Sequence, residues 1–538
     1  MSIYLLITSI IIVICVLFNK ISSKLGVPTL LAFIVLGMIF GSDGLFKISF
    51  ENYRFAEQIC SVALIFIMFY GGFGTRWSEA RPVAVKSILL STVGVVLTAG
   101  LTGVFCYFVL KMKFMESLLM GSVISSTDAA SVFSILRSKK LNLKDNTASI
   151  LELESGSNDP CSYMLTTIML SIMSGKANLG FVAYTVFAQM AYGSVIGIIV
   201  ALGGVFVLRH FKFATEGFNA AFVLAVAILA YAIPDLIGGN GYLSAYIVGI
   251  VLGNANIKNK QSLVHFFDGV TGLMQMLIFF LLGLLAFPSQ FSSVLLISVA
   301  ITLFLTFVAR PVAVFLLLTP TKCTIRQQIL VSFAGLRGAA SIVFAIMVTV
   351  SEAYTKNDVF HIVFFIVLLS ISFQGTLIPI MANKLKMIDN NVNVLKTFND
   401  YTEETDVQFI KLAITACHPW KNKALRQITF PPDTLIVMLI RNKEIIIPSG
   451  RTTLLENDIA VLSAPAFQDE TAVHLVELKI TSDSKWREKK ISEFSPNPDQ
   501  IVVMIKRNEK IIIPRGKTVI KENDILVMNS LNVKKQTI

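Results

Sequence analysis

Thirteen apolar runs, each about 16–28 residues long, follow one another through the first 383 residues of this 538-residue chain. A helix of about 20 residues crosses a hydrocarbon layer of roughly 30 Å, and only helices or closed barrels satisfy their backbone groups inside it. Hydrophobic residues make up 54% of the chain, charged residues only 15%, and the mean hydropathy is +0.71. This composition excludes a soluble globular protein of this size and predicts a polytopic, all-α membrane domain. The runs lie near residues 3–18, 27–45, 57–72, 83–110, 114–136, 149–173, 182–208, 218–234, 241–256, 268–287, 292–318, 326–350 and 359–383.

The distribution of Lys and Arg between the loops predicts the orientation in the membrane. If the N-terminus lies outside, the inner loops hold fifteen Lys and Arg and the outer loops hold six. Basic residues concentrate in cytoplasmic loops, so we expect a multi-pass protein of the plasma (inner) membrane with its C-terminus in the cytoplasm. The same loops account for most of the net charge of +12, and we therefore expect no nucleic-acid partner.

A polar, acidic cluster stands at the head of the sixth run. Residues 151–160 read LELESGSNDP, with three carboxylates in an otherwise apolar neighbourhood. On a helix, Ser155, Asn158 and Asp159 fall at i, i+3 and i+4 and share one face. If the helix begins near residue 149, Asp159 lies roughly 15 Å along it, near the middle of the bilayer. A charge at that depth costs at least about 2.5 kcal/mol, so Asp159 is expected to be a titratable ligand for a monovalent cation or a proton.

Two runs share an unusual interruption. The fifth contains SSTDAASVF at residues 125–133, and the twelfth contains GLRGAASIVF at residues 335–344. Aligning the two Ala-Ala-Ser triplets places Asp128 opposite Gly338 and Thr127 opposite Arg337. In the predicted topology these two runs cross the membrane in opposite directions. Small and polar interruptions at matching points of two inverted halves are typical of a transport site built from broken helices.

The last 150 or so residues contain no further spanning run and carry an internal duplication at a spacing of 66 residues. The segment beginning at residue 433, DTLIVMLIRNKEIIIPSGRTTLLENDIAVL, matches DQIVVMIKRNEKIIIPRGKTVIKENDILVM beginning at residue 499. Each copy predicts a strand, a short helix and further strands joined by tight turns. The chain is thus divided into a transmembrane domain (1–385), a linker (386–404) and two small α/β cytoplasmic domains (405–465 and 470–531).

The membrane part resembles the monovalent cation/proton antiporters of the NhaP type, which are related to the animal sodium/proton exchangers. The resemblance rests on Thr127-Asp128, on ESGSND at residues 154–159 and on GLRG at residues 335–338, in that order. The form ESGSNDP, followed by duplicated tail domains, is most similar to the potassium/proton antiporters of the cell-volume-regulation branch. The tail repeats resemble TrkA C-terminal (RCK C-terminal) domains. This resemblance implies inverted repeats, about thirteen transmembrane helices of which two are discontinuous, a homodimer, and roles in cell volume regulation and pH homeostasis.

The resemblance also implies roles for the residues of the cluster. Asp159 would bind the cation and the proton in turn, while Ser155 and the backbone carbonyl of Thr127 complete the oxygen shell of the ion. Asp128 would lie at the helix crossover and neutralise the helix ends. Asn158 would hold the geometry by hydrogen bonding.

Four further charged residues have expected structural positions. The resemblance implies that Glu154 pairs with Arg337 and so joins the sixth run to the twelfth. Arg310 has two open interpretations: its side chain extends to the inner face, or it pairs with an acid that the sequence does not identify. Glu152 is expected to be a charge near the helix start rather than a ligand. One departure from the family pattern is that the third run (residues 57–72) lacks the acid that some archaeal relatives place near the ion.

The function predicted is secondary active K⁺/H⁺ exchange by alternating access at Asp159. With Asn158 in place of a second aspartate, only one titrating charge is evident, which favours electroneutral 1:1 exchange. Na⁺/H⁺ antiport is an alternative, because oxygen ligands alone do not separate the two ions. A ligand-gated cation channel is a second alternative, although the sequence has no TVGYG-like filter. No catalytic motif supports an enzyme.

We expect no cofactor and no metal other than the transported cation. A GxGxxG motif, which a nucleotide-binding regulatory domain would carry, does not occur before the tail repeats. Paired domains of this kind resemble modules that bind a cyclic dinucleotide such as c-di-AMP between them. The alternative is that the tail only dimerises the protein or braces its inner face.

Overall fold

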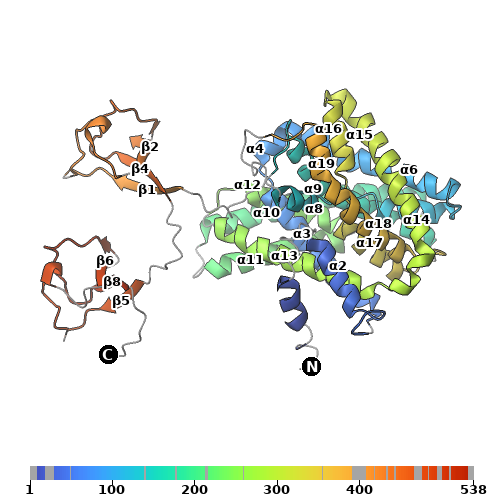
Figure 1. Ribbon diagram of the computed structural model, residues 1–538, viewed down its shortest axis with the longest axis horizontal. Coiled ribbons are helices and arrows are strands. Elements are labelled where there is room, and N and C mark those ends of the chain that lie inside the picture. The colour runs from blue at the N-terminus through green and yellow to red at the C-terminus, as the bar shows by residue number, and fades with distance from the viewer. Residues whose placement is uncertain are drawn as a thin grey trace. The chain divides into compact units, whose positions relative to one another are not determined.

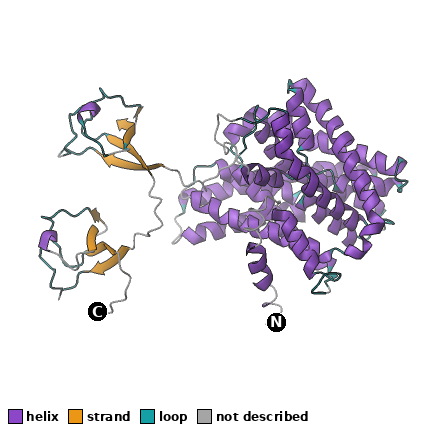
Figure 2. Cartoon of the chain, viewed as in Figure 1, coloured by secondary structure: helices purple, strands orange, loops and turns teal. Residues whose placement is uncertain are grey.

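The structure is a computed structural model that divides into two compact units, residues 1–403 and 404–538, which are described separately here. The first unit is built from helices, and the second from strands, loops and short helical turns (Figure 2). The described residues are 6, 9–17, 29–48, 50–138, 141–175, 178–211, 216–257, 260–353, 355–389, 407–416, 418–431, 434–441, 444–465, 475–482, 484–493, 500–507 and 510–530.

Each of the thirteen predicted runs falls on a helix or on two consecutive helices of the first unit (Figure 1). The first is helical at residues 9–17. The α-helices that follow along the chain, of which only α4 lies outside the predicted runs, are α2 (Thr29–Phe40), α3 (Tyr53–Gly74), α4 (Trp77–Ala80), α5 (Ala84–Leu89), α6 (Val95–Phe108), α7 (Phe114–Val123), α8 (Ala129–Ser138), α9 (Thr147–Met173), α10 (Leu179–His210), α11 (Glu216–Leu236), α12 (Gly241–Asn254), α13 (Lys260–Leu285), α14 (Phe291–Phe304), α15 (Arg310–Leu318), α16 (Ile325–Phe333), α17 (Ala339–Val350), α18 (Val359–Leu369) and α19 (Thr376–Lys384). Three π-helical segments join helices end to end: η2 (Leu90–Gly94), η4 (Leu305–Ala309) and η6 (Ser370–Gly375).

Within the described residues, seven helices are long and apolar enough to cross a membrane by length and composition. They are Tyr53–Gly74, Arg81–Phe108, Leu179–His210, Gly217–Leu236, Lys260–Leu285, Phe291–Thr321 and Val359–Lys384. Four shorter apolar helices add to them, among them α7 and α17. The long helix α9 is in neither group, because it carries the acidic cluster. The chain is therefore a helical multi-span membrane protein in which α9 is the polar exception.

Two of the spans are interrupted. Helix α7 ends at Val123 and α8 begins at Ala129, while α16 ends at Phe333 and α17 begins at Ala339. The two connecting segments cross each other, since the backbone N–H of Asp128 donates to the carbonyl of Leu336 at 2.8 Å. The interruptions lie where the two Ala-Ala-Ser motifs predicted them.

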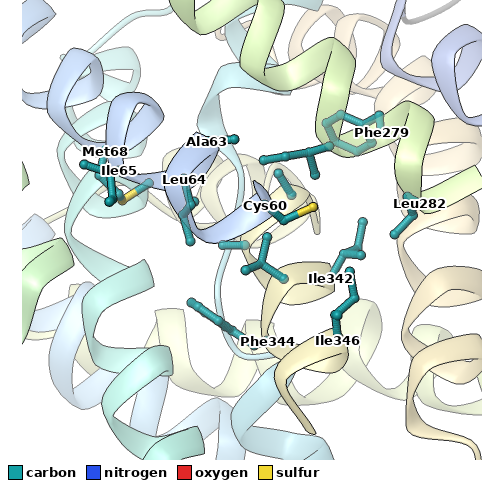
Figure 3. Close-up of a cluster of buried hydrophobic side chains, with 14 of the residues drawn as sticks. Cys60, Ala63, Leu64, Ile65, Met68, Phe279, Leu282, Ile342, Phe344 and Ile346 are labelled. Atoms are coloured by element: carbon teal, nitrogen blue, oxygen red, sulfur yellow. The ribbon is translucent and has the colours of Figure 1, made fainter. Parts of the chain in front are cut away.

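Two pairs of helices, α2 with α13 and α3 with α12, pack through glycines. A Cβ atom on Gly283 would lie 2.1 Å from the carbonyl oxygen of Ile34, and one on Gly249 would lie 2.1 Å from that of Phe69. The backbones therefore touch without intervening side chains. Side chains of α17 pack against α3 and α13 in a buried hydrophobic cluster that includes Cys60, Phe279 and Ile342 (Figure 3).

The second unit contains two antiparallel four-stranded sheets of the same topology. Their orders are β1-β4-β2-β3 and β5-β8-β6-β7, and each central strand carries a bulge at the equivalent place, Ile436/Met438 and Val502/Met504. The only described helices are the single 3₁₀ turns η7 (Leu425–Gln427) and η8 (Ile491–Glu493). The strands are β1 (Val407–Ala413), β2 (Leu435–Arg441), β3 (Glu444–Ile446), β4 (Ile459–Pro465), β5 (Leu475–Lys479), β6 (Gln500–Arg507), β7 (Lys510–Ile512) and β8 (Ile525–Ser530). The predicted linker lies outside the described residues from residue 390 onward, and the domain boundaries remain predictions.

An Arg–Asp pair recurs at equivalent positions of the two sheets. Arg441 donates two hydrogen bonds to Asp458, both at 2.8 Å, and Arg507 donates two to Asp524, both at 2.7 Å. The hydrogen bonds from Arg441 lower the pKa of Asp458 and outweigh the effect of burial. Burial acts to raise the pKa of Asp524, but the hydrogen bonds from Arg507 and from the Lys521 backbone leave it below its usual value. Both aspartates are fully buried, so each pair fixes the loop before the last strand of its sheet.

Candidate ion-binding site

Helix α9 carries the acidic cluster into the interior of the membrane unit. Asp159 and Asn158 are buried, with 6% and 0% of their surface exposed. The hydroxyl group of Ser126, in the break between α7 and α8, donates a hydrogen bond to Oδ1 of Asp159. The carboxylate of Asp159 therefore meets the interrupted helix directly.

Two other polar side chains of α9 hold the same break. The hydroxyl of Ser155 donates to the carbonyl oxygen of Thr127 at 2.7 Å, and the Asn158 amide donates to the hydroxyl of Thr127. Ser155, Asn158 and Asp159 share one helix face, as their spacing predicts, and that face contacts residues 126 and 127. Oxygen-bearing groups of five residues are thus gathered within about one turn of α9 and the facing segment.

Asp128 lies between the N-terminal ends of α8 and α17. Its carboxylate accepts hydrogen bonds from the backbone N–H and the hydroxyl of Ser131, at 3.2 and 2.5 Å. A Cβ atom on Gly338 would lie 2.2 Å from Oδ2 of Asp128, so the carboxylate also lies against the residue before α17. A negative charge in this position stabilises the positive ends of two helix dipoles.

Glu154 has a different partner from the predicted one. Its carboxylate pairs with Nη2 of Arg310 at 2.6 and 2.8 Å, and the two side chains are 1% and 2% exposed. The predicted Glu154–Arg337 ion pair is therefore wrong, and Arg310 pairs with an acid rather than extending to the inner face. Gly335 allows this, because a Cβ atom there would lie 2.9 Å from Nε of Arg310.

Arg337 binds backbone instead of a carboxylate. Its Nη1 donates to the carbonyls of Ser125 and Ser126, at 3.3 and 2.7 Å, and its own N–H donates to the hydroxyl of Ser370. The carbonyls that follow α7 have no helical partners of their own. The guanidinium of Arg337 thus connects the two interrupted spans across their crossing point.

Asp159 lines a cavity of about 400 Å³. Helices α3 and α13 form one side of it, and α9, the break and the start of α17 form the other. Four carboxylates line it, those of Asp128, Glu152, Asp159 and Asp268, and none of its lining residues in the described part of the chain is basic. A cavity whose charged lining residues are all acidic attracts cations.

Three cavity residues were not predicted as part of the site. Asp268, on α13, accepts a hydrogen bond from the hydroxyl of Tyr70 on α3 at 3.1 Å. Glu152, predicted as a charge near the helix start, is buried and lines the cavity. No motif marks Asp268 or Tyr70, because they lie 198 residues apart and meet only in the folded chain. Their one sequence signal is that each is a polar group inside an apolar run.

Comparison with known proteins gives two family matches. The transmembrane family described as "Sodium/hydrogen exchanger, transmembrane" matches residues 8–384, and the TrkA-C domain matches residues 475–528. The chain is 33% identical over 447 residues to a K(+)/H(+) antiporter NhaP of Alkalimonas amylolytica, covering 82% of this chain and 77% of the relative. It is 30% identical to a K(+)/H(+) antiporter NhaP2 of Shewanella sp. (strain ANA-3), covering 85% and 80%.

The fold is also similar to that of a solved structure. The sodium proton antiporter MjNhaP1 from Methanocaldococcus jannaschii at pH 8 matches with a TM-score of 0.64 and 24% sequence identity. The match covers 72% of this chain and 99% of that structure, so the arrangement of the helices in the membrane unit is shared.

Proposed function

Since this chain belongs to the sodium/hydrogen exchanger family and is a cation/proton antiporter rather than an enzyme, we propose that it exchanges K⁺ for H⁺ at Asp159. K⁺ is favoured by two relatives that each match more than 80% of this chain and are described as K(+)/H(+) antiporters. The observation that carries the proposal is the position of Asp159: it is buried, it lines the cavity, and it faces the break between α7 and α8.

Competition for one carboxylate is the proposed mechanism. A carboxyl group removed from water favours its neutral, protonated form, whereas a bound cation favours the ionised form. Asp159 therefore holds either a proton or a K⁺ ion. Ser155 and the carbonyl of Thr127 supply neutral oxygens beside it, and Asn158 positions Thr127. Position 158 holds an amide, so Asp159 is the one carboxylate on the face of α9 that contacts the break, and the proposed exchange is electroneutral with one H⁺ for each K⁺.

The proposed alternating access is a movement of the helices on one side of the cavity against the helices on the other side. Helices α7/α8 and α16/α17 are taken as equivalent elements of two inverted repeats, in line with their matching Ala-Ala-Ser motifs. Together with α9 they are proposed to move as a unit against a dimer-forming scaffold that contains α2, α3, α12 and α13. The glycine-mediated packing of those four helices suits a fixed frame.

The proposed setting is the plasma membrane, with the N-terminus outside and the C-terminus in the cytoplasm, where volume and pH regulation require K⁺/H⁺ exchange. The tail is proposed to contain two TrkA-C domains, because the sheet at residues 407–465 has the same strand order and Arg–Asp pair as the matched one. A cyclic dinucleotide is the proposed ligand between them. Calorimetry on residues 400–538 with c-di-AMP tests the proposed ligand, and a titration without binding heat would refute it.

Transport in proteoliposomes tests the central proposal. Fluorescence dequenching is recorded with K⁺, Na⁺ and Li⁺ across pH for the wild type, Asp159→Asn and Glu116→Gln. Glu116 is the matched control, since it is a buried acid of α7 that accepts hydrogen bonds from Asn357 and does not line the cavity. We expect Asp159→Asn to reduce exchange to the level of empty liposomes, and the control to retain it.

Three outcomes would each contradict one part of the proposal. Exchange that persists in Asp159→Asn removes this carboxylate as the site. A transport current that reverses with membrane voltage removes electroneutral exchange. A response to Na⁺ but not to K⁺ in the wild type would replace the proposed cation while leaving the site in place.

A further inference from the structure

An open groove of about 470 Å³ lies between the ends of α10 and α12, away from the ion site. Leu202, Val205 and Arg209 line it from α10, at spacings that place them on one helix face. Ile250 and Val251 line it from α12, and Trp77 of α4 lies beside Asn254 at the end near Arg209. Apart from Arg209 and Asn254, its lining is apolar.

The groove exists because α10 and α12 diverge. Near the start of the pair, a Cβ atom on Gly193 would lie 2.8 Å from the carbonyl oxygen of Asn240. One turn later, a Cβ atom on Gly197 would lie 3.1 Å from the backbone of Ser244. At Gly204 the nearest atoms are only side-chain carbons, at 3.4 Å and beyond. The two helices are thus in backbone contact at one end and separated at the other.

Basic side chains lie at the end of the groove where α10 and α12 are separated. Arg209 lies in the last turn of α10, and among the described residues no hydrogen bond or ion pair engages its guanidinium. Lys260 donates a hydrogen bond to the carbonyl of Gly253, next to the lining residue Asn254. None of the lining residues is acidic. This end of the groove therefore favours an anion.

The open side of the groove faces the bilayer. Leu202 is 59% exposed, and its neighbours Ile199 and Phe206 on α10 are 62% and 58% exposed, as expected for a lipid-facing helix. Trp77 is 44% exposed at the basic end, and tryptophan is enriched at the level of the lipid headgroups. The loops that follow α10 and α12 are those predicted to be cytoplasmic, and anionic lipids concentrate in the cytoplasmic leaflet.

We propose that this groove binds an anionic phospholipid of the cytoplasmic leaflet. One acyl chain lies between α10 and α12 against Val205 and Val251, and the headgroup phosphate pairs with Arg209 beside the Trp77 ring. The site is distinct from the cavity of Asp159, with which it shares no lining residue. Bound lipid fills the space that the diverging helices leave and so stabilises the folded protein.

The full-length protein in detergent tests this proposal. Native mass spectrometry and thermal melting are measured with phosphatidylglycerol and with phosphatidylcholine of the same acyl chains. The variants are Arg209→Gln, which removes the charge, and Leu202→Trp, which narrows the groove from its exposed wall. Arg326→Gln is the control, since Arg326 is an exposed basic residue at the end of another helix.

We expect phosphatidylglycerol adducts and a raised melting temperature in the wild type and in Arg326→Gln. Arg209→Gln should need about fivefold more lipid for the same effect, the contribution of one basic residue at an anionic surface. Leu202→Trp should lose the adduct. Equal responses to both lipids, or wild-type responses in both groove variants, overturn the proposal. So does a dimer that dissociates in Arg209→Gln without any lipid adduct in the wild type, since a second chain would then occupy the groove.

Discussion

Replacing Arg310 with methionine tests the internal ion pair that the structure assigns to Glu154. Both side chains are at most 2% exposed, so the small contribution of surface pairs does not apply. Removing one member of a buried pair leaves an uncompensated charge and costs about 3–5 kcal/mol. For a chain of this size we expect Arg310→Met to lower the melting temperature by roughly 6–10 °C, near the low end of the shift expected per kcal/mol.

The double variant Arg310→Met/Glu154→Met distinguishes the Glu154–Arg310 pair from the alternative Glu154–Arg337 pair. With both charges gone, most of the lost stability should return, because apolar side chains of similar volume replace buried pairs at little cost. The variant Arg337→Met should not be rescued by Glu154→Met, since Arg337 binds the carbonyls of Ser125 and Ser126. Thermal melting followed by size-exclusion chromatography measures all of these variants. Rescue of Arg337→Met in place of Arg310→Met would refute the assignment.

Three further predictions concern other parts of the molecule. Gly338→Ala should slow exchange in liposomes about two- to fivefold at normal folded yield, because the new methyl group displaces Asp128 from the helix ends; an unchanged rate would contradict this. Asp268→Asn should raise the half-saturating K⁺ concentration about fivefold with the maximal rate kept, since one of four cavity charges is lost; an unchanged concentration would exclude a role in attracting the ion. The pKa values of Asp458 and Asp524 are lowered in the folded tail, so their pairs with arginine stabilise it fully above the unfolded-state pKa of about 3.9. This stabilisation is lost as the pH falls below that value. Thermal melting of the tail between pH 7 and pH 3 measures the loss. Equal stability across that range would contradict the last prediction.

The positions of the helices and of both breaks were predictable from the sequence, because long apolar runs and the paired Ala-Ala-Ser motifs are local signals. The shared face of Ser155, Asn158 and Asp159 follows from helical spacing alone. The partner of Glu154 was not predictable. Arg310 and Arg337 both lie in apolar runs, and the choice between them depends on the break before α17, which directs Arg337 to backbone carbonyls.

The set of residues that line the cavity was also not predictable from the sequence. Asp268 shows no motif, and only the packing of α13 against α3 brings it to the cavity that Asp159 lines. In the tail, the 66-residue duplication marked both sheets, but it did not show that each predicted short helix is a single 3₁₀ turn. Local patterns thus located the elements, and long-range contacts decided which polar groups meet.

The backbone contacts of Gly283 with Ile34 and of Gly249 with Phe69 have a mechanical consequence. Two helices that touch through their main chains have no rotamers to exchange at the contact, so they can neither slide nor tilt in small steps. In the proposed alternating-access movement, these backbone contacts stay fixed. The change of arrangement then takes place at neighbouring surfaces, where side chains interdigitate.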